Sequence, residues 1–176
     1  MSADGPRWLD DEERETWMAL VGTLVRLPAA LDAQLQRDAG ISHFAYQVLA
    51  GLSMVPGRTL RMSELATFTE GSLSRLSHVV ARLERRGWVT RRPDPADGRC
   101  TLATLTEAGW EKVVATAPGH VAEVRRLVFD PLSGEQQRLL REIGRRINAS
   151  IDASVDAASI APEGAPAPPL TQGERS

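Results

Sequence analysis

The residues best suited to chemistry lie on one face of a helix predicted for residues 72–86, SLSRLSHVVARLERR. At about 100° per residue, its apolar side chains form a core face on one side: Leu73, Leu76, Val80 and Leu83. The opposite side carries hydroxyl, imidazole and guanidinium groups and no carboxylate: Ser74, Arg75, His78, Arg82 and Arg85. Arginine can donate a pair of hydrogen bonds to guanine in the major groove, and serine and histidine can bond bases or phosphates. This face therefore predicts DNA reading, with an ordinary solvated surface as the alternative.

Five arginines gather around the hairpin predicted directly after this helix, within RRGWVTRRPDPADGRC at residues 85–100. Residues 88–92 and 100–106 have the pattern of two strands, and the turn-forming residues between them predict a hairpin. Arg91 and Arg92 lie at its base, within reach of backbone phosphates. Arg99 lies just past the tip, where the negative potential of a narrow groove would attract it.

Asp97 lies two residues before Arg99 and does not itself favour phosphate binding. We interpret it as a carboxylate that orients a guanidinium through a charge-assisted hydrogen bond. The alternative is that Asp97 and Gly98 only build the turn.

The distribution of charge supports a phosphate-binding partner more than the net charge does. The 176-residue chain has a formal charge of −2. Residues 58–99 hold nine arginines and five carboxylates, a balance of +4, whereas the rest holds twelve basic and eighteen acidic residues, a balance of −6. A basic segment on an acidic body is typical of a phosphate-binding module, although a solvated arginine-rich surface has the same count.

Neighbouring elements must position the polar helix face. Residues 62–68 are predicted as a short helix with Leu65 buried, residues 69–71 as a turn, and Ser72 as the N-cap of the next helix. Gly87 ends that helix as a C-terminal cap. Helix, turn and capped helix at this spacing predict a helix-turn-helix, and the hairpin would be the wing of a winged helix. A helix over 43–54 precedes it, with apolar residues facing inward: Phe44, Val48, Leu49 and Leu52.

Longer helices flank this region. Residues 10–38 carry an apolar stripe at helical spacing: Trp17, Leu20, Leu24, Leu27, Leu31 and Leu35. Pro28 predicts a kink or a break in that helix, and Gly40 its end. Two helices follow the hairpin, one starting at Thr106 and interrupted at Pro118, the other running from a capping box at residues 133–136 to about residue 151. Their apolar surface predicts pairing with a second copy, with packing inside one chain as the alternative.

Composition and spacing favour a cytoplasmic protein that is not an enzyme. No run of about 18 apolar residues predicts a membrane span, the acidic N-terminus lacks a secretory signal, and one cysteine fits a reducing compartment. No nucleophile–base pair or phosphate-binding glycine loop is recognisable. His43, His78 and His120 are too scattered to indicate a metal site. We therefore expect no catalytic residues, no cofactor and no metal.

The order of elements and the run from Ser63 to Trp110 resemble the multiple antibiotic resistance regulator (MarR) family of bacterial transcription factors. The resemblance covers about residues 15–150. Two family motifs are matched, Asp-Pro-x-Asp-x-Arg by Asp94, Pro95, Asp97 and Arg99, and Leu-Thr-x-x-Gly by Leu105, Thr106 and Gly109. The sequence departs from the family at Gly98 and at His78, positions that are often arginine.

The resemblance implies a mainly α fold, a winged helix-turn-helix with a small β-hairpin wing at 43–105 and dimerisation helices at 10–38 and 106–155. A flexible N-terminus is expected at 1–9, and the composition of 160–176 predicts a disordered tail. The implied function is that of a ligand-responsive repressor, a homodimer that binds a palindromic operator in double-stranded DNA. The alternative is a helical dimeric protein-interaction module that has lost DNA binding.

The resemblance also implies roles for individual residues. The DNA-facing positions are in the recognition helix and the wing: Ser72, Ser74, Arg75, Ser77, His78, Arg82, Arg91, Arg92, Asp97 and Arg99. Arg99 would enter the minor groove, oriented by Asp97. A small aromatic or anionic effector is expected, with Trp17, Arg58 and Arg61 as its candidate ligands; core packing for Trp17 and DNA phosphates for the two arginines are the alternatives. Cys100 lies in a wing strand, where a structural role is favoured over redox sensing.

Overall fold

A computed structural model of the protein describes residues 6–160, with side chains described for residues 6–155. The chain divides into two compact units, one up to Asp130 and one from Pro131. Residues 1–5 of the segment 1–9, which the sequence predicts as flexible, lie outside the described residues. The tail predicted as disordered lies outside them from residue 161 onward.

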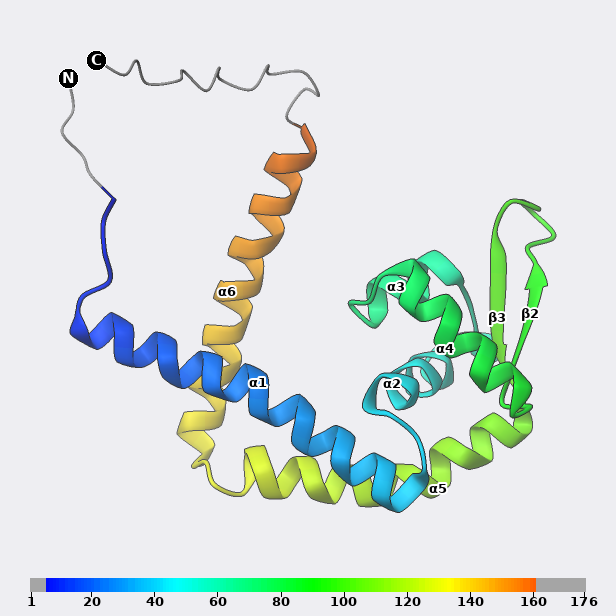
Figure 1. Ribbon diagram of the computed structural model, residues 1–176, viewed down its shortest axis with the longest axis horizontal. Helices are drawn as coiled ribbons and strands as arrows, with labels where there is room; N and C mark the ends of the chain where they lie inside the picture. The colour runs from blue at the N-terminus through cyan, green and yellow to red at the C-terminus, as the bar shows by residue number, and fades with distance from the viewer. Residues whose placement is uncertain (1–5, 161–176) are drawn as a thin grey trace, which may run out of the picture. The chain divides into compact units, whose positions relative to one another are not determined.

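Residues 41–105, which we call the head, combine three helices with a small sheet (Figure 1). The helices are α2 (His43–Ser53), α3 (Met62–Phe68) and α4 (Leu73–Arg85). The strands are β1 (Thr59–Arg61), β2 (Val89–Pro93) and β3 (Thr101–Leu105), antiparallel in the order β1-β3-β2. A short 3₁₀ helix, Pro56–Arg58, leads into β1. The predicted winged helix-turn-helix is therefore confirmed, with one strand more than the sequence indicated.

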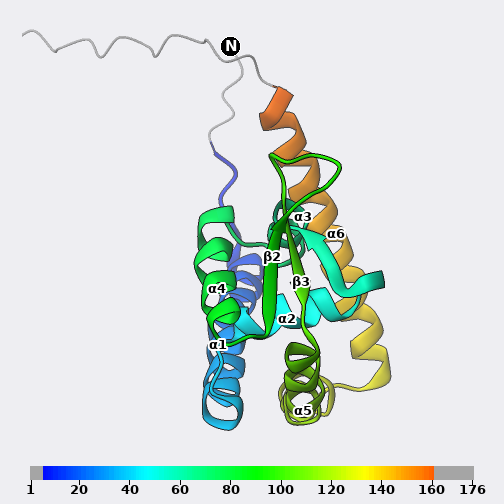
Figure 2. The ribbon, with the colours of Figure 1, turned by 90° about the vertical axis from the view of Figure 1, so that its right-hand side faces the viewer.

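The extra strand β1 is only three residues long and has no alternating pattern of its own. Leu60 pairs with Ala103 of β3, so the strand forms because the hairpin offers it an edge. The hairpin itself stands beside α4 and projects past it (Figure 2).

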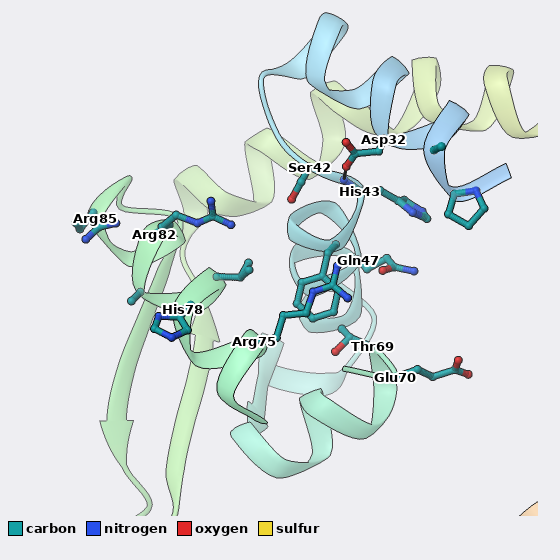
Figure 3. A pocket seen from close by; sticks show the side chains of 15 residues that line it. Asp32, Ser42, His43, Gln47, Thr69, Glu70, Arg75, His78, Arg82 and Arg85 are labelled. Carbon is teal, nitrogen blue, oxygen red and sulfur yellow. Dashed lines mark hydrogen bonds between the residues drawn. The ribbon is translucent and has the colours of Figure 1, made fainter. Parts of the chain in front are cut away.

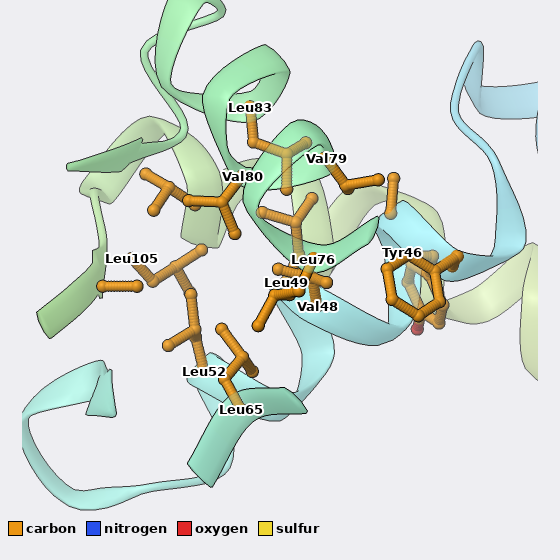
Figure 4. Packing of buried hydrophobic residues seen from close by; sticks show 14 of the residues in the cluster. Tyr46, Val48, Leu49, Leu52, Leu65, Leu76, Val79, Val80, Leu83 and Leu105 are labelled. Carbon is orange, nitrogen blue, oxygen red and sulfur yellow. The ribbon is translucent and has the colours of Figure 1, made fainter. Parts of the chain in front are cut away.

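The hydrophobic core of the head is formed by residues of a single chain (Figure 4). Fully buried leucines and valines meet from all three helices: Val48, Leu49, Leu52, Leu65, Leu76 and Val80. Leu73, predicted on the core face of α4, is instead 53% exposed. As the first residue of α4 it precedes the turn at which the helix meets the core.

Helix α1 (Asp11–Ala39) runs without interruption through Pro28, so of the predicted kink or break the break is wrong. Proline at this position leaves the carbonyl of Leu24 without its helical partner. Leu24 lies on an exposed part of the helix, with 61% of the residue's surface accessible. The helix begins with a capping box between Asp10 and Glu13 and ends at Gly40, whose φ of 65° is left-handed.

The carboxyl end of α1 is bound by cations from two other helices. Arg86, the C-cap of α4, donates to the carbonyl of Gly40 at 3.1 Å. Lys112 of α5 (Glu107–Val124) donates to the carbonyl of Ala39 at 2.8 Å. Both contacts neutralise carbonyls that the end of a helix leaves without partners.

Helix α5 is also continuous, and the interruption predicted at Pro118 is wrong. The carbonyl that loses its partner there belongs to Val114, which is 52% exposed. A π-helical turn, Arg125–Phe129, follows α5 directly.

The second unit contains α6 (Gly134–Ile160), which is longer than the predicted helix to about residue 151. Its start is the predicted capping box, in which Ser133 and Gln136 exchange hydrogen bonds of 2.8 and 3.2 Å. About half of the surface of each apolar side chain on α6 remains exposed: Leu139, Leu140, Ile143, Ile147, Ile151 and Val155.

Helix α1 is long and apolar enough to cross a membrane by length and composition alone. This differs from the sequence-based expectation that no such segment exists. The same test is passed by helices of soluble proteins, and α1 carries Arg26 and Pro28 within its apolar stretch.

Candidate nucleic-acid interface

Helix α4 presents the polar face that its sequence predicts. The hydroxyl of Ser72 accepts a hydrogen bond from the backbone N–H of Arg75 at 3.2 Å, which caps the helix. The five polar residues of the predicted face are all exposed: Ser74, Arg75, His78, Arg82 and Arg85. Gly87, with φ of 73°, ends the helical stretch and turns the chain into the wing.

The turn between α3 and α4 is held by its own backbone. The hydroxyl of Thr69 donates to the carbonyl of Leu65 at 2.8 Å, and the N–H of Gly71 donates to the carbonyl of Ala66 at 3.1 Å. Glu70 takes a left-handed φ of 48°, which is uncommon outside glycine. These contacts set the angle at which α4 leaves α3.

The guanidinium of Arg75 lies over the ring of Phe44 on α2, with Cζ 4.1 Å from the ring centre. Both residues line an open cleft of about 1050 Å³ between α1, α2 and α4 (Figure 3). Arg82, Arg85 and His43 also line it. The sequence did not indicate this contact, because Phe44 and Arg75 lie on different helices.

Arg91 of the wing is bound to α4. Its guanidinium donates to Glu84 at 2.6 and 3.0 Å, and its backbone N–H donates to the same carboxylate at 3.2 Å. These hydrogen bonds lower the pKa of Glu84 below its ordinary value. Arg91 therefore joins the base of the wing to α4, a role that its position in the sequence did not reveal.

Asp94 anchors the wing to the start of α3. It is only 8% exposed; its carboxylate accepts a hydrogen bond from Nε of Arg61 at 2.8 Å and forms an ion pair with Nη2 of the same guanidinium at 2.7 Å. It also accepts from the backbone N–H of Ala96 at 2.9 Å. The hydrogen bond from the Ala96 backbone lowers the pKa of Asp94, and the guanidinium of Arg61 lowers it further.

Asp97 contacts the backbone of Arg99 and not its guanidinium. Its carboxylate accepts from the N–H of Arg99 at 3.1 Å and from the thiol of Cys100 at 3.5 Å. These two contacts suit the turn-building alternative, and among the described residues no ion pair joins Asp97 to Arg99; the orientation of a guanidinium by Asp97 stays a prediction. The bond to Asp97 raises the pKa of the Cys100 thiol, which disfavours a reactive thiolate.

Ser77 and Arg99 line a smaller pocket of about 250 Å³ between α4 and the wing. Arg61, Arg91 and Ser63 line it as well. The pocket places hydroxyl and guanidinium groups from α3, α4 and the hairpin on one surface, beside the polar face of α4.

The three candidate effector ligands are not brought together. Trp17 is 51% exposed on the first half of α1. Arg58 donates to Glu107 at 2.9 Å and stacks on Trp110 at 4.3 Å, whereas Arg61 is bound to Asp94. Arg58 and Arg61 thus each have a partner that is distant in the sequence, and an effector site formed by the three residues stays a prediction.

The Leu-Thr-x-x-Gly motif joins the wing to α5. The Thr106 hydroxyl donates to the carbonyl of Gly87 at 2.6 Å and accepts from the N–H of Gly109 at 3.0 Å. A Cβ on Gly109 would lie 2.1 Å from the carbonyl oxygen of Trp88, so no larger residue fits.

Two of the three histidines, judged scattered from the sequence, lie together. The rings of His43 and His120 are 5.7 Å apart, and Tyr46 lies 4.6 Å from His120. Burial lowers the pKa of both histidines, and His43 lowers that of His120 further. No group of three or more metal-ligating side chains occurs within the part of the chain that the structure describes.

Comparison with known proteins agrees with this geometry. The profile of the MarR family matches residues 39–99. The chain is 34% identical over 103 residues to the transcriptional regulator HosA of Escherichia coli O111:H-, covering 58% of this chain and 73% of HosA. It is 40% identical over 62 residues to the HTH-type regulator YdcH of Bacillus subtilis, covering 35% of this chain and 42% of YdcH.

The fold is similar to that of Sco3205, a MarR family transcriptional regulator from Streptomyces coelicolor whose crystal structure contains DNA. The TM-score is 0.80 at 48% identity, and the match covers 84% of this chain and 92% of Sco3205.

Proposed function

Because the chain belongs to the MarR family of transcriptional regulators, we propose that it binds a palindromic operator as a homodimer and represses transcription until an effector releases it. Family membership supports DNA binding itself. It also separates the chain from enzymes, since its relatives are regulators. The operator symmetry, the repressor role, the effector and the cytoplasmic location are parts of the proposal.

The observation that carries the proposal is the exposed face of α4, which has cationic and hydroxyl groups and no carboxylate. An α-helix fits the major groove, where arginine can recognise guanine and serine can bond bases or phosphates. The residues assigned to this groove are Ser72, Ser74, Arg75, Ser77, His78 and Arg82.

The wing arginines take a second set of contacts. Arg92 is assigned to backbone phosphate and Arg99 to the minor groove, where negative potential is high. Arg91 adds positive charge at the base of the wing while its bonds to Glu84 keep the wing against α4.

Exposed apolar side chains support dimerisation. Leu24 and Val25 on α1 are 61% and 67% exposed, and α6 carries its own half-exposed apolar stripe. A second copy could cover these surfaces. Two recognition helices would then lie about 34 Å apart, one turn of DNA.

The cleft between α1, α2 and α4 is the proposed effector site. It is lined by cationic groups, including Arg75 and Arg82, beside the ring of Phe44, which suits a small aromatic anion. A ligand seated there would touch the recognition helix directly and compete with its DNA contacts.

In vitro selection from a random DNA pool with the full chain tests the proposal. We expect a palindrome with half-sites about ten base pairs apart. Arg82→Ala should relax the preference at one base position by about 1–3 kcal/mol. Arg92→Ala should weaken the binding of all DNA sequences alike. It should also reduce the salt dependence of the affinity by about the amount due to one phosphate contact. Failure to enrich any sequence would instead favour the protein-interaction alternative.

A further inference from the structure

We propose that Phe44 of α2 sets the base preference of the protein indirectly, as a positioning residue that holds the guanidinium of Arg75 for one base of the operator. This rests on the proposed function, in which α4 enters the major groove. Phe44 would be a specificity-determining residue that does not itself touch DNA.

The first part of the argument is the position of Arg75 in the first turn of α4. Its backbone N–H is held by the Ser72 hydroxyl at 3.2 Å, and its guanidinium lies 4.1 Å over the Phe44 ring. Both ends of this long side chain are therefore constrained. Figure 3 shows Arg75 reaching from α4 toward α2 in the cleft that Gln47 also lines.

The ring is itself held in place. Phe44 is only 7% exposed and belongs to the core of the head. A Cβ on Gly71 would lie 2.6 Å from its Cζ and 2.7 Å from its Cε2. The turn of the helix-turn-helix thus contacts one edge of the ring, while Arg75 covers a face.

The chemistry of stacking suits base recognition. A guanidinium on an aromatic face keeps its five N–H donors in its own plane, available at the edges for the paired acceptors of guanine. Stacking also removes side-chain freedom that would otherwise be lost on binding DNA. No carboxylate forms an ion pair with Arg75 among the described residues, although Asp32 and Glu70 line the same cleft.

Arg75 differs in this respect from the other arginines of the exposed face. In the described part of the chain, neither Arg82 nor Arg85 stacks on an aromatic ring. Arg86 does, 5.0 Å from the centre of the Trp88 ring, but its guanidinium also donates to the carbonyl of Gly40. Arg75 is therefore the arginine of this face whose orientation depends on a ring from another helix.

Phe44→Leu in the full chain tests the proposal, with Phe68→Leu as the matched control. The ring of Phe68 also packs against a glycine, since a Cβ on Gly51 would lie 2.6 Å from the ring. No described cation stacks on the Phe68 ring. Selection from a random pool with wild type and Arg75→Ala first identifies the base position that Arg75 reads. At that position Phe44→Leu should lower the discrimination between bases about two- to fivefold, the worth of an exposed cation–π contact.

Two further variants complete the design. Gly71→Ala displaces the ring without changing it and should weaken the preference at the same position, which keeps the test valid if Phe44→Leu fails to fold. Phe44→Leu combined with Arg75→Ala should equal Arg75→Ala alone, whereas Phe68→Leu should keep the wild-type preference.

The proposal is overturned if a folded Phe44→Leu protein keeps full preference at the Arg75 position. It is equally overturned if affinity falls by the same factor for every sequence, since that indicates a general effect on the head. If Arg75→Ala changes no base preference, the assignment of α4 fails and the positioning role fails with it.

Discussion

The head and the first half of α1 carry similar apolar patterns but bury them very differently. Leu49 of α2 has no exposed surface, whereas Leu24 of α1 is 61% exposed. Both residues belong to apolar stripes at helical spacing, and the sequence predicts both stripes as apolar faces of helices. The second half of α1, including Leu35, does pack against the head. The head therefore completes its core within one chain, whereas the amino half of α1 leaves its apolar side chains exposed.

The largest effect is expected from placing charge on that unfinished surface. Leu24→Glu should convert the dimer into monomers and lower operator affinity about a hundredfold, because two linked half-site contacts become one. Size-exclusion chromatography with light scattering and a gel shift on the selected operator would measure both changes.

Met54→Glu is the matched control. Met54 is 74% exposed at the end of α2, in the head, so the same charge there should leave the dimer and its affinity intact. A Leu24→Glu protein that remains dimeric with wild-type affinity would show that α1 is not part of the interface.

The next effect separates the two regions by stability. Leu49→Ala should lower the free energy of unfolding by about 2–5 kcal/mol, because it leaves a cavity among fully buried neighbours. Met54→Ala, at the exposed residue that caps the same helix, should lower the free energy of unfolding much less. Urea unfolding monitored by circular dichroism would measure both, and equal losses would contradict the burial described for the head.

The smallest effect concerns the contact between the head and α5, where His43 meets His120. Their folded pKa values are lowered by burial, so the unfolded chain binds protons more readily below about pH 6.5. Stability from this pair is complete above that pH and is lost as pH falls through the lowered folded values. The melting temperature measured by thermal unfolding should therefore fall from pH 7 to pH 5. It should fall less in His120→Gln.

His78→Gln provides the comparison for this pH effect, because His78 is exposed on α4 and takes part in neither of the ring contacts described for the pair. It should keep the part of the pH dependence that comes from His43 and His120. An identical dependence in wild type and His120→Gln would show that the pair does not contribute.

Local signals made the head predictable from the sequence. The bounds of α3 were predicted as observed, and those of α4 within one residue, since Ser72 and Gly87 mark its ends whatever it packs against. The polar face of α4 followed from helical geometry. Turn-forming residues between two strand patterns indicated the wing, and Thr106 as a cap indicated the start of α5.

Contacts between distant residues were beyond the sequence. Strand β1 exists because β3 offers an edge, and the Arg61–Asp94 and Arg91–Glu84 pairs join elements whose approach is decided by the packed core. The same reason explains why His43 and His120 looked scattered. Pro118 was misjudged because proline is unfavourable inside a helix as a local signal, whereas α5 continues through it in the folded chain.

The two cations at the carboxyl end of α1 have a mechanical consequence. Arg86 comes from the end of the recognition helix and Lys112 from α5, and each binds a carbonyl at the last residues of α1. A swing of α1 about that end would pull on both helices at once. In the proposed dimer, such a movement of α1 would change the separation of the two copies of α4.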